Sequence, residues 1–286
     1  MTDPTQKNTS CGQAGCSSSV GNEQARQDRQ IESSLSKIKH KILVMSGKGG
    51  VGKSSLSTNI AMTLSLKGFK TGLLDVDIHG PSIAGMMGLE GLLEITGDRK
   101  VIPKKPNENL SVVSMQSLMQ DKDQAVIWRG PAKTGIIRQF IGDVLWGEID
   151  FLIVDAPPGT GDEPLSVAQT ISDAKSLIIT TPQEIALSDV RKSINFCRTV
   201  NLEILGLVEN MGPFDCPCCG KKIKIFKSDG GRLTAKNMGV DFLGSIPFDP
   251  EVVKTCDSGK PIAQLGSGNG FVSALQNVVK EMVGKL

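Results

Sequence analysis

Nine consecutive residues near the start of the chain are well suited to phosphate chemistry: Gly47-Lys48-Gly49-Gly50-Val51-Gly52-Lys53-Ser54-Ser55. The first eight satisfy the spacing G-x-x-x-x-G-K-[ST], which is typical of the phosphate-binding loop of nucleoside triphosphatases. In such a loop, backbone N–H groups point at the phosphates, and the helix that follows adds its positive end. We expect Lys53 to contact the β- and γ-phosphate oxygens and Ser54 to hold Mg²⁺. The pattern does not require Lys48, which therefore indicates one subgroup of such proteins.

The residues on either side of this run have the order strand, loop, helix. Residues 42–45 are apolar and partly β-branched, as in a buried strand. Leu56, Ile60 and Leu64 recur every four residues and therefore lie on one face of a helix, and Gly68 suits its end. The run thus has the context that a phosphate-binding loop requires.

Carboxylates follow two further apolar runs. Asp75 and Asp77 lie at the end of a strand predicted over residues 71–75, and Asp155 lies at the end of another. Ligands of parallel α/β sheets bind outside the carboxyl ends of the strands. We expect Asp155 to bind Mg²⁺ directly or through its water shell, Asp77 to orient an attacking water, and Gly159 to donate its N–H to the γ-phosphate. For any one of these acids, capping of a strand end is the competing interpretation.

These segments resemble those of a known class of ATPases. The loop with its additional lysine, the segment Asp75 to Ser82 and the segment Asp155 to Gly159 look like the MinD/ParA/nitrogenase-iron-protein class of P-loop ATPases. Within that class the chain, from about residue 41 to its end, resembles the Mrp-type iron–sulfur cluster carriers. The motifs that carry the closer resemblance are Asp77-Ile78-His79-Gly80-Pro81-Ser82, residues 155–162, Thr181-Pro182-Gln183, and Glu209-Asn210-Met211 followed by Cys216-Pro217-x-Cys219.

The resemblance implies roles for several residues. ATP and Mg²⁺ would be the ligands of the loop. The class signature lysine, here Lys48, would cross a homodimer interface to the partner's nucleotide and act with Lys53 and Asp77 in catalysis. Asn210 resembles the position that contacts the adenine edge, and Pro247 lies where the family closes the adenine pocket. We expect hydrolysis to be slow, because Asp77 orients water but no strong general base is apparent.

The second informative run is Cys216-Pro217-Cys218-Cys219-Gly220. A C-P-x-C-G turn places Cys216 and Cys219 on the same side, so one chain offers two thiolates to a metal. A four-thiolate site needs two more, which a two-fold dimer axis would supply. The resemblance implies that arrangement, with a [4Fe–4S] cluster bridging two subunits. Zinc satisfies the same thiolate geometry and is the alternative. The role of Cys218 stays open.

The other cysteines carry less information. The chain has seven, an odd number that argues against a disulfide framework, and residues near Met1 are too polar for a secretion signal, so we expect a cytoplasmic protein. Cys11 and Cys16 lie in a polar tail, either as exposed thiols or as part of a dimer-shared site. Cys197 falls in a helical pattern and is predicted to fill the core. We assign no role to Cys256.

Composition excludes some classes of partner. The formal charge is +2, from 32 basic and 30 acidic residues, and aromatic residues make up 4% with no tyrosine. We therefore expect no nucleic-acid partner. No apolar stretch approaches 18 residues, and the amphipathic segment 271–286 lacks the basic polar face of a membrane-binding helix. We predict that this segment packs on the core.

The chain divides at residue 40. Residues 1–40 read as a flexible extension that ends in a short, weakly amphipathic helix within 23–41. Residues 41–286 alternate strands and helices, which predicts one three-layer α/β P-loop domain with a mostly parallel central sheet and helices on both faces. The predicted strands are 42–45, 71–75, 110–115, 150–155, 176–181, 202–208 and 241–246, and the predicted helices are 56–64, 81–88, 131–146, 163–172, 185–200, 229–238 and a last helix after Asn269.

Three functions compete on these observations. The sequence favours an ATP-dependent carrier or scaffold that binds a labile [4Fe–4S] cluster across a homodimer and passes it to recipient apoproteins. The second hypothesis is a MinD/ParA-like positioning or switch ATPase with a structural zinc knuckle, which the thiols of Cys216 and Cys219 disfavour. The third is a reductase component like the nitrogenase iron protein, but the C-P-x-C turn is foreign to that pattern.

Overall fold

The computed structural model describes residues 17–78, 80–118, 130–216, 218–266 and 268–286. Three residues singled out above, Cys11, Cys16 and His79, lie outside the described residues. The same is true of Pro217, so the cysteine turn, residues 216–220, is described through its other residues.

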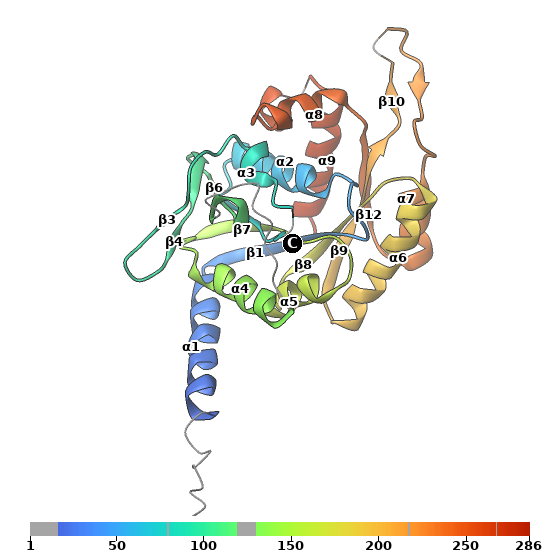
Figure 1. Ribbon diagram of the computed structural model, residues 1–286. Helices are drawn as coiled ribbons and strands as arrows, with labels where there is room; N and C mark the ends of the chain where they lie inside the picture. Colours follow the sequence, from blue (N-terminus) through green and yellow to red (C-terminus); the bar gives the residue numbers. More distant parts are fainter. Residues whose placement is uncertain (1–16, 79, 119–129, 217, 267) are drawn as a thin grey trace, which may run out of the picture.

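An eight-stranded sheet forms the centre of the molecule, in the order β12-β9-β8-β1-β7-β2-β6-β5 (Figure 1). Seven strands are parallel, and only the edge strand β5 runs antiparallel, to β6. This confirms the predicted mostly parallel sheet. The strand bounds are β1 (Ile38–Ser46), β2 (Thr71–Asp75), β5 (Lys104–Asn107), β6 (Leu110–Ser114), β7 (Ile149–Asp155), β8 (Lys175–Thr180), β9 (Glu203–Gly212) and β12 (Phe242–Pro247).

Helices cover both faces of this sheet, and one apolar cluster lies between the sheet and the helices on each face (Figure 1). The central strands are almost fully buried, because parallel strands joined by helical crossovers are covered on both sides. One face carries α1 (Ser17–Leu35), α4 (Gly130–Asp143), α5 (Asp162–Thr170), α6 (Glu184–Thr199) and α7 (Gly230–Met238). The other carries α2 (Lys53–Leu66), α3 (Ile83–Met86), α8 (Pro250–Asp257) and α9 (Gly270–Val283), with a 3-10 turn at Ile262–Leu265. Another 3-10 turn, Met115–Leu118, follows β6.

The N-terminal helix differs from the sequence expectation in extent. It spans Ser17–Leu35, whereas β1 begins at Ile38, so the division at residue 40 falls inside a strand. Ile31 and Leu35 are buried in the same apolar cluster as α4. Gly142 on α4 permits this close approach, since a Cβ atom there would lie 2.8 Å from Ile31 Cγ1. Spacing every three to four residues, rather than overall apolar content, makes this helix part of the core.

The C-terminal helix α9 packs as predicted. Its apolar face is buried against the sheet and α2, through Phe271, Val272, Leu275, Val278, Val279 and Met282. Asn269 caps its first turn by accepting N–H bonds from Phe271 and Val272 at 2.7 and 3.2 Å. In the part of the chain that the structure describes, no helix has the length and apolar character needed to span a bilayer.

Two small hairpins were not predicted. β3 (Glu94–Ile95) pairs with β4 (Val101–Ile102), and β10 (Phe214–Asp215) pairs with β11 (Lys222–Ile223), both antiparallel. Strands of two residues are too short to show an alternating pattern in the sequence. The second hairpin carries the cysteine turn on an arm, here defined as residues 213–226, that extends away from the sheet (Figure 1).

Candidate functional site

The glycine-rich run connects β1 to the first turn of α2, as the sequence predicted. Gly50 and Gly52 both adopt left-handed backbone conformations, with φ of 80° and 81°. Cβ atoms built at Gly49 and Gly50 would meet nothing within 4 Å, so the loop has an open surface of backbone. At Gly52 a Cβ would instead overlap Nδ2 of Asn210. The loop therefore has both the open cradle and the tight packing that a phosphate site requires.

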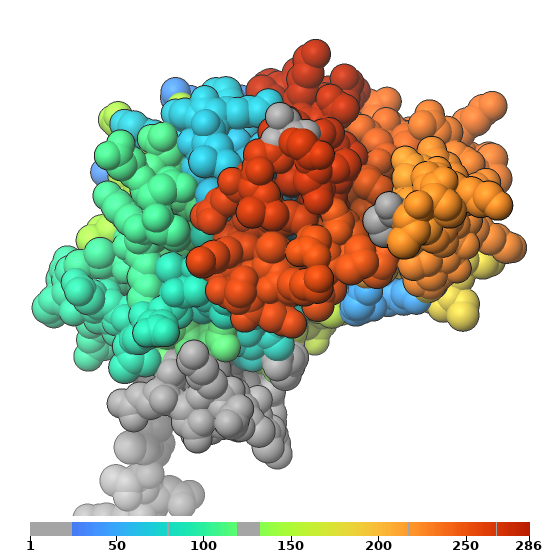
Figure 2. All heavy atoms as spheres, turned by 90° about the horizontal axis from the view of Figure 1, so that it is seen from above, coloured from blue at the N-terminus to red at the C-terminus, as the bar shows by residue number. Residues whose placement is uncertain are grey.

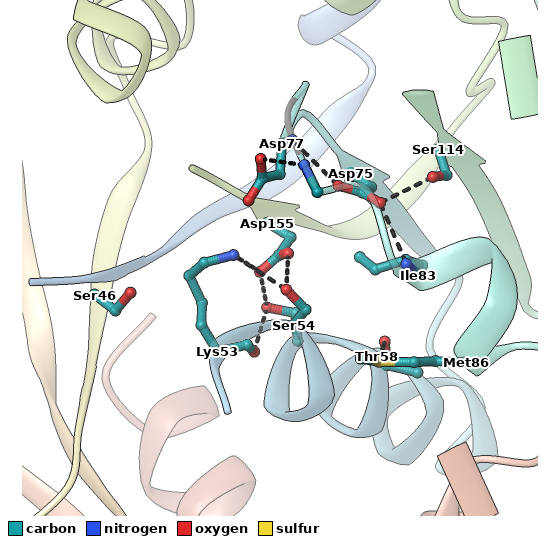
Figure 3. A network of polar contacts seen from close by, with 12 residues as sticks. Ser46, Lys53, Ser54, Thr58, Asp75, Asp77, Ile83, Met86, Ser114 and Asp155 are labelled. Atoms are coloured by element: carbon teal, nitrogen blue, oxygen red, sulfur yellow. Dashed lines mark hydrogen bonds and ion pairs between the residues drawn. The ribbon is translucent and has the colours of Figure 1, made fainter. Parts of the chain in front are cut away.

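A buried polar network joins this loop to β7 (Figure 3). Lys53 Nζ lies 2.7 Å from Asp155 Oδ1, and both side chains are almost fully buried. The other carboxylate oxygen accepts a hydrogen bond from Ser54 Oγ at 2.6 Å, and Ser57 Oγ donates to Oδ1 at 2.7 Å. A hydroxyl and a carboxylate this close together form an oxygen donor set of the kind that Mg²⁺ prefers. The structure thus brings Asp155 to the adjacent residues Lys53 and Ser54, although it follows Ser54 by 101 residues in the sequence.

The acids after β2 take different positions. Asp75 is fully buried, and its carboxylate accepts bonds from Ser114 Oγ at 2.8 Å and from the N–H groups of Asp77 and Ile83 at 3.2 and 3.3 Å. Burial, and next the charge of Asp155, raise the pKa of Asp75 to about 7. Sequence reasoning did not assign this residue a role. Its position two residues before Asp77 at the end of a strand was the available signal.

Asp77 lies beyond the end of β2, on the same side of the sheet as Lys53 and Asp155 (Figure 3). Its Oδ1 accepts the N–H of Gly80 at 3.1 Å, at an exposed position. A carboxylate that faces solvent next to a buried lysine–aspartate pair can contact water. The structure therefore places Asp77 near Lys53 and Asp155, and its predicted role in orienting water stays a prediction.

Gly159 reaches the same edge of the sheet, but its N–H is already engaged. It donates to the carbonyl of Ser46, at the end of β1, at 2.8 Å. Its φ of 92° lies in the left-handed region. The predicted bond to a γ-phosphate would need this backbone bond to be exchanged. Lys48 is half-buried in the loop, and its carbonyl accepts a bond from Ser46 Oγ at 3.0 Å.

A cavity of about 240 Å³ opens beside the start of α2. Asn210 and Pro247 both line it, and Asn210 Nδ2 donates to the carbonyl of Val51 at 2.9 Å. Their predicted place around an adenine ring stays a prediction. Ser55 and Cys256 also line it, with Oγ and Sγ 3.7 Å apart. Most of the remaining lining is apolar, as in pockets for planar rings. No local sequence signal pointed to Cys256.

The cysteine turn forms a compact loop at the end of the arm. The N–H of Cys216 donates to the carbonyl of Lys221, and the N–H of Gly220 donates back to Cys216, both at 2.9 Å. Gly220 has φ of 68°, so a glycine suits this turn. Backbone N–H bonds from Cys218 and then Cys219, and next the Cys219 thiol, lower the pKa of Cys216. The turn therefore favours a thiolate, the form that binds metals.

Exposure separates the five cysteines of the described chain. Cys218 and Cys219 are exposed and Cys216 is half-buried, so all three can be reached from solvent. Cys197 is fully buried, with Sγ 3.8 Å from Met45 Sδ, which confirms that it fills the core. Among the residues that the structure describes, no three histidine, cysteine or acidic side chains come together as a metal site.

The sheet order, the loop between β1 and α2, and the buried Lys53–Asp155 pair together define a P-loop NTPase. Comparison with solved structures agrees. A nucleotide-binding protein from Archaeoglobus fulgidus in complex with ADP superposes with a TM-score of 0.72 at 37% identity, covering 82% of this chain and 91% of that one. The septum site-determining protein MinD from Pyrococcus horikoshii, in complex with Mg-ADP, shares the fold with a TM-score of 0.63 at 21% identity, over 85% and 95%.

Sequence comparison narrows the class. The model of the NUBPL iron-transfer P-loop NTPase family matches residues 37–283, and the chain belongs to that family. An iron-sulfur cluster carrier protein of Methanocaldococcus jannaschii is 44% identical over 264 residues, 91% of each chain. The cytosolic Fe-S cluster assembly factor CFD1 of Saccharomyces cerevisiae is 44% identical over 260 residues, 87% of this chain and 89% of that one.

Proposed function

We propose that this protein is an ATP-dependent carrier that holds a labile iron–sulfur cluster as cargo and passes it to recipient apoproteins. The observation that carries the proposal is the pair Cys216 and Cys219, which lie in one solvent-accessible turn at the end of an arm on an NTPase fold. The names of relatives across most of the chain, as carrier and assembly proteins, support it. The yeast relative, which is cytosolic by its printed name, supports a cytosolic location.

ATP would bind across the loop and the 240 Å³ cavity. Lys53 would leave Asp155 for the β- and γ-phosphates, and Ser54 with Asp155 would hold Mg²⁺, whose charge would neutralise the phosphates. Asn210 and Pro247 would contact the base. Asp77 would orient the attacking water, and Lys48 of a second copy would reach the phosphates as charge develops on them. The supporting geometry is the part-buried hydrogen bond from Ser54 Oγ to Asp155 Oδ2 at 2.6 Å.

The cluster would lie on the two-fold axis of a homodimer. Two thiolates from each turn would complete the four ligands of a [4Fe–4S] cluster, or of zinc in its place. Two ligands per chain make the cargo easy to release when the dimer opens. Binding of ATP would therefore act on the cluster by favouring one arrangement of the two subunits.

Anaerobic reconstitution with iron and sulfide tests the proposal. The full chain should give a brown dimer with roughly four iron and four sulfide per dimer, and Cys216→Ser/Cys219→Ser should lose it. Cys218→Ser is the matched control, since it removes a thiol from the same turn. Equal loss in that control would contradict the assignment of the pair. A colourless dimer that keeps tightly bound zinc would contradict the carrier function and favour a MinD-like ATPase with a structural zinc.

A further inference from the structure

One continuous segment of chain joins the cysteine turn to the 240 Å³ cavity beside α2, which is called the base-side cavity below because the base of ATP is proposed to bind there. Asn210 and Met211 line the 240 Å³ cavity at the end of β9, and Cys216 follows six residues after Asn210. The root of this segment is held firmly. Glu209 is buried and accepts the N–H of Gly231 at 2.7 Å and the hydroxyl of Ser245 at 3.0 Å. Displacement at the cavity would therefore be transmitted outward along the arm rather than absorbed at its root.

A second connection runs between two aromatic rings. Phe214, in the first strand of the arm, lies against Phe248 with ring centroids 5.6 Å apart and planes tilted by 54°. Phe248 follows β12, and its N–H donates to the carbonyl of Gly212 at 3.0 Å. Phe248 therefore contacts the last residue of β9 through its backbone and the arm through its ring.

Phe248 also belongs to two cavities at once. It lines the 240 Å³ base-side cavity and a larger cleft of about 1060 Å³, which Phe214, Lys222 and Lys224 of the arm line as well. The surface of the arm, in orange, lies beside the red C-terminal elements that form the other wall (Figure 2). Phe214 lines only the larger cleft of these two. A substitution at Phe214 can therefore alter the link without altering the base-side wall.

We propose that Phe214 and Phe248 are positioning residues that couple occupancy of the base-side cavity to the orientation of the cysteine turn. A base in that cavity would contact Phe248, fix the segment Pro247–Asp249, and through the ring contact restrict the arm. The coupling is a difference in stability between two arm orientations, so it acts equally in both directions. One aromatic contact of this kind supports a coupling of about two- to tenfold. The inference rests on the proposed function for the position of the base in this cavity and for the identity of the cargo.

Amide hydrogen exchange of the arm, with and without Mg-ADP, is the first experiment and needs no cluster. In the full-length protein, we expect saturating nucleotide to slow exchange of the bonded amides of Cys216, Gly220 and the β10–β11 ladder by about two- to tenfold. Phe214→Ala should lose this effect, and by reciprocity its affinity for Mg-ADP should fall by no more than about tenfold. Saturable binding of Mg-ADP also shows that the variant folds. Phe226→Ala is the matched control, as another aromatic residue of the arm, and should keep the effect.

The results separate the link from the cargo. The proposed coupling would be overturned if Mg-ADP left the amide exchange rates of the wild-type arm unchanged. It would also be overturned if Mg-ADP still slowed exchange in the arm of Phe214→Ala. Cluster transfer to an apo-ferredoxin, measured with and without Mg-ATP, is the second experiment. A wild type that binds no cluster would refute the proposed function and leave the exchange result standing. If Mg-ATP changed the rate of cluster transfer equally in Phe214→Ala and in the wild type, the coupling would be refuted and the proposed function would stand.

Discussion

Asp75 offers the sharpest test of the electrostatics at this site. It is a fully buried carboxyl group, held by Ser114 and two backbone N–H groups and close to the charge of Asp155. Burial first, and Asp155 second, raise its pKa from 3.8 to about 7. The perturbation is Asp75→Asn, which removes the titration while keeping one acceptor oxygen and nearly the same volume.

The sign follows from proton linkage. Between pH 3.8 and about 7 the folded state keeps a proton that the unfolded state has released, so the free energy of unfolding of the wild type falls as the pH rises. The total loss above the folded pKa is about 4 kcal/mol, and roughly 2.5 kcal/mol of it falls between about pH 5 and about pH 8. As the pH rises through that window, the free energy of unfolding of Asp75→Asn should therefore increase by roughly 2.5 kcal/mol relative to that of the wild type.

The assay is urea unfolding of both proteins across this pH range, at constant ionic strength with EDTA and no nucleotide. Asp150→Asn is the control. The Asp150 carboxylate accepts bonds from Lys39 Nζ at 2.6 Å and the Lys70 N–H at 2.9 Å, and the Lys39 bond lowers its pKa. Asp150 is therefore ionised throughout, and its variant should differ from the wild type by a constant amount.

The prediction concerns how the difference in free energy of unfolding between Asp75→Asn and the wild type changes with pH, not its absolute size. A difference between Asp75→Asn and the wild type that stays flat across the window would show that Asp75 is already ionised in the folded protein at low pH. The same flat difference is expected if the partners of Asp75 stabilise its charge more than burial opposes it, because the carboxyl group is then ionised in both states above about pH 5. A flat difference would therefore refute the reasoning.

Two further predictions concern packing. Gly52→Ala and Gly50→Ala introduce the same left-handed strain, but only the Cβ atom at position 52 meets Asn210. In urea unfolding, Gly52→Ala should therefore lower the free energy of unfolding by about 1 kcal/mol or more beyond its control, Gly50→Ala. It should also bind Mg-ADP at least about tenfold more weakly. Equal losses would contradict the predicted clash. Ile31→Ala should lower the free energy of unfolding by about 2–4 kcal/mol, because it empties a buried site between α1 and α4, whereas the exposed control Ser33→Ala should change it by less than about 0.5 kcal/mol. A loss below about 1 kcal/mol at Ile31 would show that α1 contributes little to the core.

Features that depend on residues close in sequence were predictable. The spacing of glycines and lysine from 47 to 54 predicted the strand, loop and helix that the structure shows, because these three elements follow one another directly in the sequence. The cysteine turn was predictable for the same reason, since Cys216 and Gly220 bond to each other directly. Alternating strands and helices also sufficed for a mostly parallel sheet, because short crossovers leave few other arrangements.

Short or irregular elements were less predictable. The hairpins β3–β4 and β10–β11 have strands of two residues, too few for a period to appear. The start of β1 at Ile38, and the helix that ends at Leu35, depend on burial against α4 rather than on local propensity. Composition alone could not show that burial, because the apolar residues of this segment are sparse.

Only the tertiary structure decided which side chains meet. Ser54 and Asp155 are separated by 101 residues, Val51 and Asn210 by 159, and Ser55 and Cys256 by 201. These pairs form because parallel strands align their carboxyl ends along one edge of the sheet, in an order that no local pattern encodes. The engagement of the Gly159 N–H by Ser46, and the contact of Phe214 with Phe248, arise in the same way. The sequence by itself determined the chemistry that each segment can perform, and the order of the strands determined which segments perform it together.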